Sequence, residues 1–313
     1  MKRRELMLAC TLFTVFFTGC QKELSEENGI DPTIPITPPT TRLDSNFLSK
    51  VYMLEFNGTQ YDTIDVYTYN YDNLKRMTAF IDSTYSSSGI LEYFTSNHYS
   101  YNASDTLPFK TTELQSNTLL TGDTSIIFHF YDNLARRTKD SIIELRAPSG
   151  GFGSSIDTTV KQYSYASNSI IGFSTRHSGN TISFEKDTAL IDANGNLSSY
   201  KSYLYDPSIP STERRLFVVY TFDNKPSPFS KQSNFVATQI LSRRPYNFFE
   251  NFQKNNLVTE DETIFVNNSP FAQTVLTYAY SYNSRGYVTE AVEDDGATPV
   301  GLRNKYIFVY KAL

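Results

Sequence analysis

The sequence predicts an all-β protein, in which one antiparallel meander of roughly a dozen or more strands curls or closes into a barrel-like sheet. The first observation behind this prediction is the aromatic content. The chain has 23 tyrosines and 23 phenylalanines in 313 residues, a composition typical of strands rather than helices. The second observation is a short motif that recurs from residue 45 onward: an aromatic residue, any residue, a second aromatic residue, then Asp or Asn with turn formers.

The two clearest copies of this motif are residues 69–76 and 129–136, which match at five of eight positions. Weaker copies lie at residues 99–102, 163–165, 203–206, 220–224 and 280–286, and a degenerate one lies at 189–196. The second aromatic residues are Tyr71, Tyr101, Tyr131, Tyr165, Tyr205, Phe222 and Tyr282, with gaps of 30, 30, 34, 40, 17 and 60 residues. A strand, a turn and a returning strand take about 15–17 residues, so a gap near 30 holds two hairpin steps.

Alternate residues of a strand share one face of the sheet. Tyr67, Tyr69 and Tyr71 should therefore lie on one side of their strand, with Val66 and Asn70 on the other. The Asp, Asn and Gly residues that follow each strand supply the Asx-turn or left-handed geometry that reverses the chain.

One segment, residues 231–256, breaks this alternation. It is apolar without a period of two, and Pro245 interrupts it. We predict a short irregular or helical insertion there, which caps one end of the sheet. Connections of this length in compact domains are often functional, but capping of the core is the simpler role.

The N-terminus predicts export. Residues 2–4 are basic, and the uncharged, mainly apolar run 6–17 is too short to span a bilayer, which needs about 20 residues. The next residues, 17–20, resemble the lipobox of bacterial lipoproteins, although Phe17 stands where that pattern usually has an aliphatic residue. The resemblance implies cleavage before Cys20 and acylation of its thiol and amino groups. The alternative is an ordinary secretory signal with a chance cysteine.

Residues 21–27 contain one lysine and several acidic residues. This composition resembles the export signal of surface-exposed lipoproteins of Bacteroidota. A solvated tether in the periplasm would look much the same. Residues 31–41 contain four prolines and form a semi-rigid spacer. We therefore predict a signal peptide over 1–19, a lipidated cysteine with a tether over 20–43, and a single β domain over 44–313. The predicted location is the outer membrane, through the lipid anchor, with the cell surface favoured over the periplasmic face.

The repeated motif resembles the YD (RHS-like) repeat. The C-terminal half more specifically resembles uncharacterised Bacteroidota lipoproteins with a porin-like β fold. The matching segments are residues 222–229, 254–258, 280–289 and 306–310, and the resemblance covers about residues 50–313. It implies a fold and a location, and it implies no activity.

Composition and motifs exclude several function classes. A net charge of −5 with 19% charged residues argues against a nucleic-acid partner, and two cysteines exclude a disulfide framework. The three histidines, His98, His129 and His177, lack the spacing of metal ligands. His129 replaces a repeat tyrosine, and we interpret it as a packed strand residue.

The remaining motifs have simple structural interpretations. The Gly-rich residues 150–154 are expected to form a hairpin tip. Residues 192–196 resemble a calcium loop, but they lack its sixth-position Gly and twelfth-position Glu, so a tight hairpin explains them better. The acids of 290–295 are expected to form a solvated turn. No catalytic residue, cofactor site or metal site is predicted.

Six Asp-Ser/Thr triplets resemble the acceptor site for protein O-glycosylation in Bacteroidota. Their hydroxyl residues are Thr63, Ser83, Thr106, Ser141, Thr158 and Thr188. The alternative is chance, because Asp and Thr are frequent and strand ends favour such triplets.

Three functions remain open. The first is a non-enzymatic envelope lipoprotein that binds a glycan, peptide or protein partner. The second is a glycan hydrolase with dispersed acids, which two carboxylates and a histidine in one cleft with shifted pKa values would favour. The third is a structural envelope component. An integral porin is disfavoured because Asn70, Ser100, Ser164 and Ser281 make the exposed face too polar for lipid.

Overall fold

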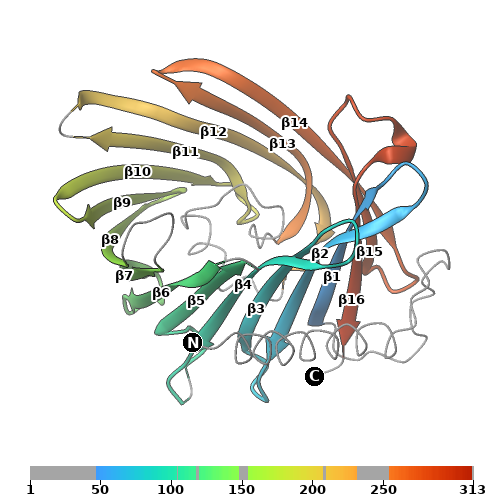
Figure 1. The fold of residues 1–313 in the computed structure, drawn as a ribbon, viewed down its shortest axis with the longest axis horizontal. Coiled ribbons are helices and arrows are strands. Elements are labelled where there is room, and N and C mark those ends of the chain that lie inside the picture. The colour runs from blue at the N-terminus through green and yellow to red at the C-terminus, as the bar shows by residue number, and fades with distance from the viewer. Residues whose placement is uncertain are drawn as a thin grey trace, which may run out of the picture.

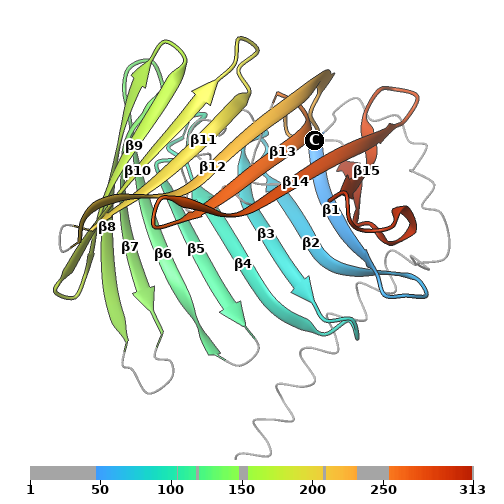
Figure 2. The same ribbon diagram turned by 90° about the horizontal axis from the view of Figure 1, so that it is seen from above.

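The computed structural model describes residues 47–103, 105–117, 120–147, 154–206, 209–230 and 254–311. Sixteen strands form one closed antiparallel barrel (Figures 1 and 2). Each strand pairs with its neighbours in sequence, and β1 (Phe47–Phe56) closes the wall by pairing with β16 (Lys305–Lys311). The predicted all-β antiparallel meander is confirmed, and the sheet closes into a barrel rather than remaining an open curl, a choice that the sequence left open.

The other strands follow in chain order. They are β2 (Tyr61–Tyr71), β3 (Met77–Tyr85), β4 (Leu91–Ser100), β5 (Lys110–Asn117), β6 (Leu120–Tyr131), β7 (Arg137–Arg146), β8 (Ser155–Ala166), β9 (Ser169–Ser178), β10 (Thr181–Ile191), β11 (Leu197–Asp206), β12 (Ile209–Pro226), β13 (Asn255–Val266), β14 (Ser269–Tyr282) and β15 (Val288–Asp294), with a 3-10 turn η2 (Val300–Leu302) before β16. Among the described residues, no helix is long and apolar enough to span a membrane.

The barrel has two rims, and the aspartate turns of the repeated motif, after β2, β6 and β10, lie at one of them. We call it the tyrosine rim: β1 begins there and the even-numbered strands end there, while the opposite end is the far rim. In the turn after β6, Asp132 accepts backbone N–H bonds from Leu134 and Arg136 at 2.9 Å, and the Arg136 side chain donates to its other oxygen. Ala135 takes a left-handed φ of 58°. Asp72 builds the same turn after β2, so the predicted Asx geometry is confirmed.

The repeat tyrosines also have a common structural role. Six of them donate a hydroxyl hydrogen bond to a backbone carbonyl on, or just before, the strand that precedes their own. The pairs are Tyr71–Leu48, Tyr101–Met77, Tyr131–Pro108, Tyr165–Arg137, Tyr280–Leu257 and Tyr310–Val288, at 2.6–2.9 Å. The gap of 30 residues thus spans two strands, as predicted.

Two motif copies depart from this arrangement. Tyr205 is the last residue but one of β11, an odd-numbered strand, and therefore lies at the far rim. The corresponding place at the tyrosine rim belongs to Ile191, in the degenerate copy at the end of β10. On β14 the rim donor to Leu257 is Tyr280 rather than Tyr282. A two-residue spacing within one strand does not reveal which way that strand runs, so the pattern could not separate the two rims.

A layer of buried side chains lies directly inside the tyrosine rim. Tyr69 is fully buried and Tyr220 and Phe308 nearly so. Phe229, which follows β12, packs against Tyr69 and Phe308 with ring centroids 6.3 Å away. Aromatic and aliphatic side chains therefore pack the barrel interior next to the tyrosine rim.

Several predictions fall on residues that the structure does not describe. The signal peptide, Cys20 and the tether lie outside the described residues, as do 231–253 of the predicted insertion and most of the Gly-rich tip. The end of the insertion was misplaced, because Asn255 already begins β13.

Candidate functional site

The barrel encloses a cavity of about 970 Å3. Inward side chains of β3 to β10 form most of its wall, and those of β1, β2, β11 and β14 to β16 complete it. The cavity extends from the buried layer inside the tyrosine rim toward the far rim, since residues as distant as His129 and Gln115 line it. It is the candidate ligand site.

Strand alternation explains why so many charged groups line the cavity. On β7, Asp140, Ile142 and Glu144 line it, so Ser141 and Ile143 must face outward. The neighbouring strands do the same, and seven carboxylate and four cationic side chains line the cavity. They are Asp82, Glu113, Asp123, Asp140, Glu144, Glu185 and Glu293, with Arg137, Arg146, Lys161 and Arg176.

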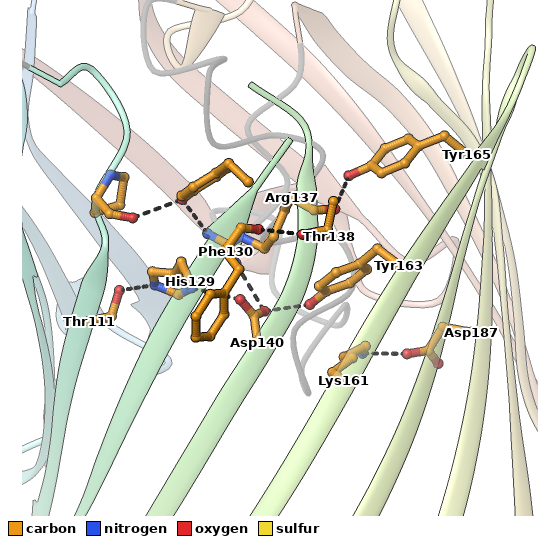
Figure 3. A network of polar contacts seen from close by, with 12 residues as sticks. Thr111, His129, Phe130, Arg137, Thr138, Asp140, Lys161, Tyr163, Tyr165 and Asp187 are labelled. Atoms are coloured by element: carbon orange, nitrogen blue, oxygen red, sulfur yellow. Dashed lines mark hydrogen bonds and ion pairs between the residues drawn. The ribbon is translucent and has the colours of Figure 1, made fainter. Parts of the chain in front are cut away.

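A hydrogen-bonded network centred on Asp140 forms the inner end of the cavity (Figure 3). His129 lies between Thr111 and Asp140, with its Nε2 2.8 Å from the Thr111 hydroxyl and its Nδ1 2.8 Å from Asp140 Oδ1. The other Asp140 oxygen accepts hydrogen bonds from Tyr163 at 2.6 Å and Arg137 at 3.2 Å. Both carboxylate oxygens are thus engaged.

Burial and neighbouring charges decide the protonation states in this network. Burial lowers the pKa of His129, and the Arg137 charge lowers it further, which favours a neutral imidazole. Burial alone would raise the pKa of Asp140. The charge of Arg137 and the hydrogen bond from His129 outweigh burial and hold that pKa below its usual value. The resulting group is a neutral histidine beside a buried Arg–Asp ion pair.

The other cations of the cavity are also paired. Lys161 donates to Asp187 at 2.5 Å, and Tyr200 donates to the second oxygen of the same carboxylate at 2.7 Å. Arg176 bridges Asp157 at 2.7 Å and Glu144 at 3.1 Å. These pairs cross between strands, so they fix the charged wall in one arrangement.

The opposite side of the lumen carries acids beside tyrosines. Tyr306 donates to Glu293 at 2.6 Å. Burial, reinforced by the charges of Glu262 and Glu293, raises the pKa of Glu260 to about 8. Glu260 therefore holds a proton at neutral pH.

The Thr111–His129–Asp140 chain has the connectivity of a nucleophile, base and orienting acid. Two observations separate it from an accessible catalytic site. Both ring nitrogens of His129 are engaged, and Thr111 is 5% exposed and does not line the cavity. Among the described residues, no group of three His, Cys, Asp or Glu side chains could hold a metal ion.

The structure places the sequence-predicted residues as follows. His129 is a packed strand residue, as expected, whereas its pairing with Asp140 was not anticipated. His98 and His177 face away from the lumen, because their strand neighbours Asn97 and Arg176 line it.

The O-glycosylation candidates lie on the outer surface or near a rim. Ser83, Ser141, Thr158 and Thr188 face outward, since the Asp before each of them faces the lumen. Thr63 lies half-buried in β2, and Thr106 is exposed after β4.

No protein-family model matches the chain. No curated protein matches it either. A porin-like protein from Bacteroides vulgatus has a similar structure, with 10% sequence identity and a TM-score of 0.50 over 86% of this chain and 100% of that one. A porin-like protein from Bacteroides uniformis aligns with 12% identity and a TM-score of 0.42, over 84% of this chain and 98% of that one. The first similarity shows that the chain has a porin-like β fold, and at this identity it shows the fold alone.

Proposed function

We propose that this protein is a lipid-anchored envelope protein, and that its barrel is a non-enzymatic binding module for a neutral, hydroxyl-rich ligand such as a short glycan. The observation that carries the proposal is the cavity of about 970 Å3, whose walls combine flat aromatic rings with fixed hydrogen-bonding groups.

The chemistry of the wall suits such a ligand. Tyr67, Phe80 and Tyr306 contribute apolar ring edges to the wall, and each is at most 7% exposed. Asn97 and Gln115 supply amide donors and acceptors for hydroxyl groups. Because lining carboxylates outnumber lining cations by seven to four, an anionic ligand is disfavoured.

The topology also suits an anchored receptor. β1 begins at the tyrosine rim, so a lipid on Cys20 would be joined to the barrel at that end. The aromatic layer closes this half of the interior, and the polar part of the cavity extends toward the far rim. The composition of residues 21–27 supports display on the cell surface rather than on the periplasmic face.

A water-exposed barrel explains the outer wall better than a membrane-spanning one. Lys186, Lys201 and Asp261 face outward near the middle of β10, β11 and β13. A lysine at the bilayer midplane of a spanning barrel costs about 2–4 kcal/mol.

A cavity-blocking pair of variants tests the proposal. The mature chain is screened on a glycan array, and hits are measured by calorimetry with Ser125→Phe and Thr124→Phe. Ser125 lines the cavity, whereas Thr124 faces outward from the same strand. We expect Ser125→Phe to weaken binding at least tenfold and Thr124→Phe to leave it unchanged.

Other results would contradict the proposal. Equal binding by both variants, or no saturable binding to any glycan, rejects the lumen as a glycan site. Turnover of a bound glycan would instead favour the hydrolase hypothesis.

A further inference from the structure

One side of the outer wall carries exposed apolar side chains on consecutive strands. On the outward face of β6 to β10, Phe128, Phe130, Leu145, Ile156, Phe173 and Ile182 are each between 38% and 65% exposed. We call this outward surface of β6 to β10 the lateral face. Exposed apolar side chains that gather on consecutive strands mark an interaction surface more often than scattered ones do.

The charges of the lateral face have a single sign. Among the described side chains, its ionised residues are Lys139 and Lys186, and every carboxylate of these strands points into the lumen or lies at a turn. The opposite part of the wall differs, because Asp261, Glu290 and Asp294 face outward there. The two parts of the wall therefore differ in the sign of their charges. Exposed apolar side chains occur on both, since Val219, Ile264 and Val275 lie on β12 to β14.

Aromatic rings accompany these charges. The Lys139 ammonium lies 5.0 Å from the centroid of the Phe130 ring, and Phe173 stacks on Phe184 with centroids 5.9 Å apart. Aromatic rings beside lysines are the combination that surfaces resting at the boundary of a lipid bilayer display. Anionic headgroups would neutralise the lysines, while the rings and aliphatic side chains would enter the acyl boundary.

We propose that the lateral face rests on an anionic lipid surface. This proposal depends on the envelope location proposed above and not on the identity of the lumen ligand. The chain between Cys20 and β1, residues 20–46, could reach at most about 90 Å, which is enough for an anchored barrel to lie on its side.

The contribution of the two lysines to the affinity for an anionic lipid surface can be estimated. Each basic residue near an anionic surface contributes about 1 kcal/mol, or roughly fivefold in affinity. Reversing the charges of Lys139 and Lys186 should therefore weaken binding to this surface by about thirtyfold or more.

The experiment uses the mature chain with Cys20→Ser, so that no lipid holds it to the membrane. Its binding to vesicles of phosphatidylglycerol and phosphatidylethanolamine is compared with binding to phosphatidylcholine by flotation. The test variant is Lys139→Glu with Lys186→Glu. The matched control is Lys50→Glu with Lys305→Glu, which makes the same charge change on β1 and β16. Circular dichroism confirms that both variants fold.

We expect binding to the anionic vesicles alone, lost in the test variant and retained in the control, and weakened by salt. Phe173→Ser should weaken binding to the anionic vesicles without any change of charge.

Equal binding to both vesicle types, equal losses in both lysine variants, or absence of binding would overturn the proposal. Bound protein that resists a carbonate wash would show integral insertion and overturn it as well. A dimer that the test variant dissolves, without vesicle binding, would assign the lateral face to a second copy. Glycan binding in solution does not depend on any of these outcomes.

Discussion

Glu260 makes the free energy of unfolding depend on pH in a way that one substitution should remove. Its side chain lies in the barrel interior on β13 and the residue is 4% exposed. Burial, followed by the charges of Glu262 and Glu293, raises its pKa from 4.5 to about 8. Between these two values the folded barrel keeps a proton that the unfolded chain has released.

The sign and size of the effect follow from this difference. A raised pKa contributes stability that is fully present below pH 4.5 and is lost as the pH rises through 8. The loss runs at about 1.4 kcal/mol per pH unit, so a shift of about 3.5 units amounts to at most about 5 kcal/mol. A glutamine in the same place cannot ionise and fills nearly the same volume.

We therefore expect Glu260→Gln to change the free energy of unfolding by less than about 1 kcal/mol at pH 5. At pH 9 the variant should be more stable than the wild type by several kcal/mol, with about 5 kcal/mol as the upper bound. Urea unfolding followed by far-UV circular dichroism at pH 5, 7 and 9 measures this, since the chain has no tryptophan. The control is Asp261→Asn, one residue along and facing outward, which should retain the pH dependence of the wild type. A Glu260→Gln effect of equal size at pH 5 and pH 9 would refute the reasoning.

Three further substitutions test the rim and the Asp140 network. Tyr71→Phe removes a rim hydrogen bond and should lower the free energy of unfolding in urea by about 1 kcal/mol, whereas the outward-facing Tyr52→Phe should not. Asp132→Ala should lower the Tm by calorimetry, and Asp132→Asn should restore most of it, because an amide oxygen can accept the same backbone bonds. Asp140→Asn leaves the buried Arg137 cation without its anion and should cost about 3–5 kcal/mol in urea at pH 7. The pKa of Asp140 is lowered, so this contribution is present above its unfolded pKa of 3.8 and should disappear as the pH falls below that value.

The architecture could be predicted because the repeat carries it locally. Tyr67, Tyr69 and Tyr71 alternate on one strand, and the aspartate after them closes the turn with its own side chain. Both features lie within one short window of sequence, so they do not depend on which strands become neighbours. The period gives an approximate count of a dozen or more strands, and a sheet of that size must curl or close, but the period does not decide between the two.

The site could not be predicted, because its contacts depend on register. His129 and Asp140 lie on β6 and β7 and meet because residue 129 pairs with residue 140 across the two strands. Lys161 reaches Asp187 across β9, 26 residues along the chain. A shift of one residue in either register would turn these side chains to the outer wall. The signal that was available was the recurrence of charged residues at inward positions of consecutive strands.

The same alternation gives the Asp-Ser/Thr triplets a structural origin. A barrel with a charged lumen and a hydroxyl-rich outer wall places an acid on one face and a Ser or Thr on the other at successive positions. Asp157 and Thr158 are such a pair, since Asp157 is 2% exposed and binds Arg176 inside while Thr158 is exposed outside. The Asp-Thr pattern is therefore expected even without modification. Thr106 is different, because it is exposed in a connection between strands, where alternation imposes no such pairing. A role as an O-glycosylation acceptor would explain the Asp-Thr pair at Thr106. The alternation of lumen-facing and outward-facing residues already explains the pair at Thr158.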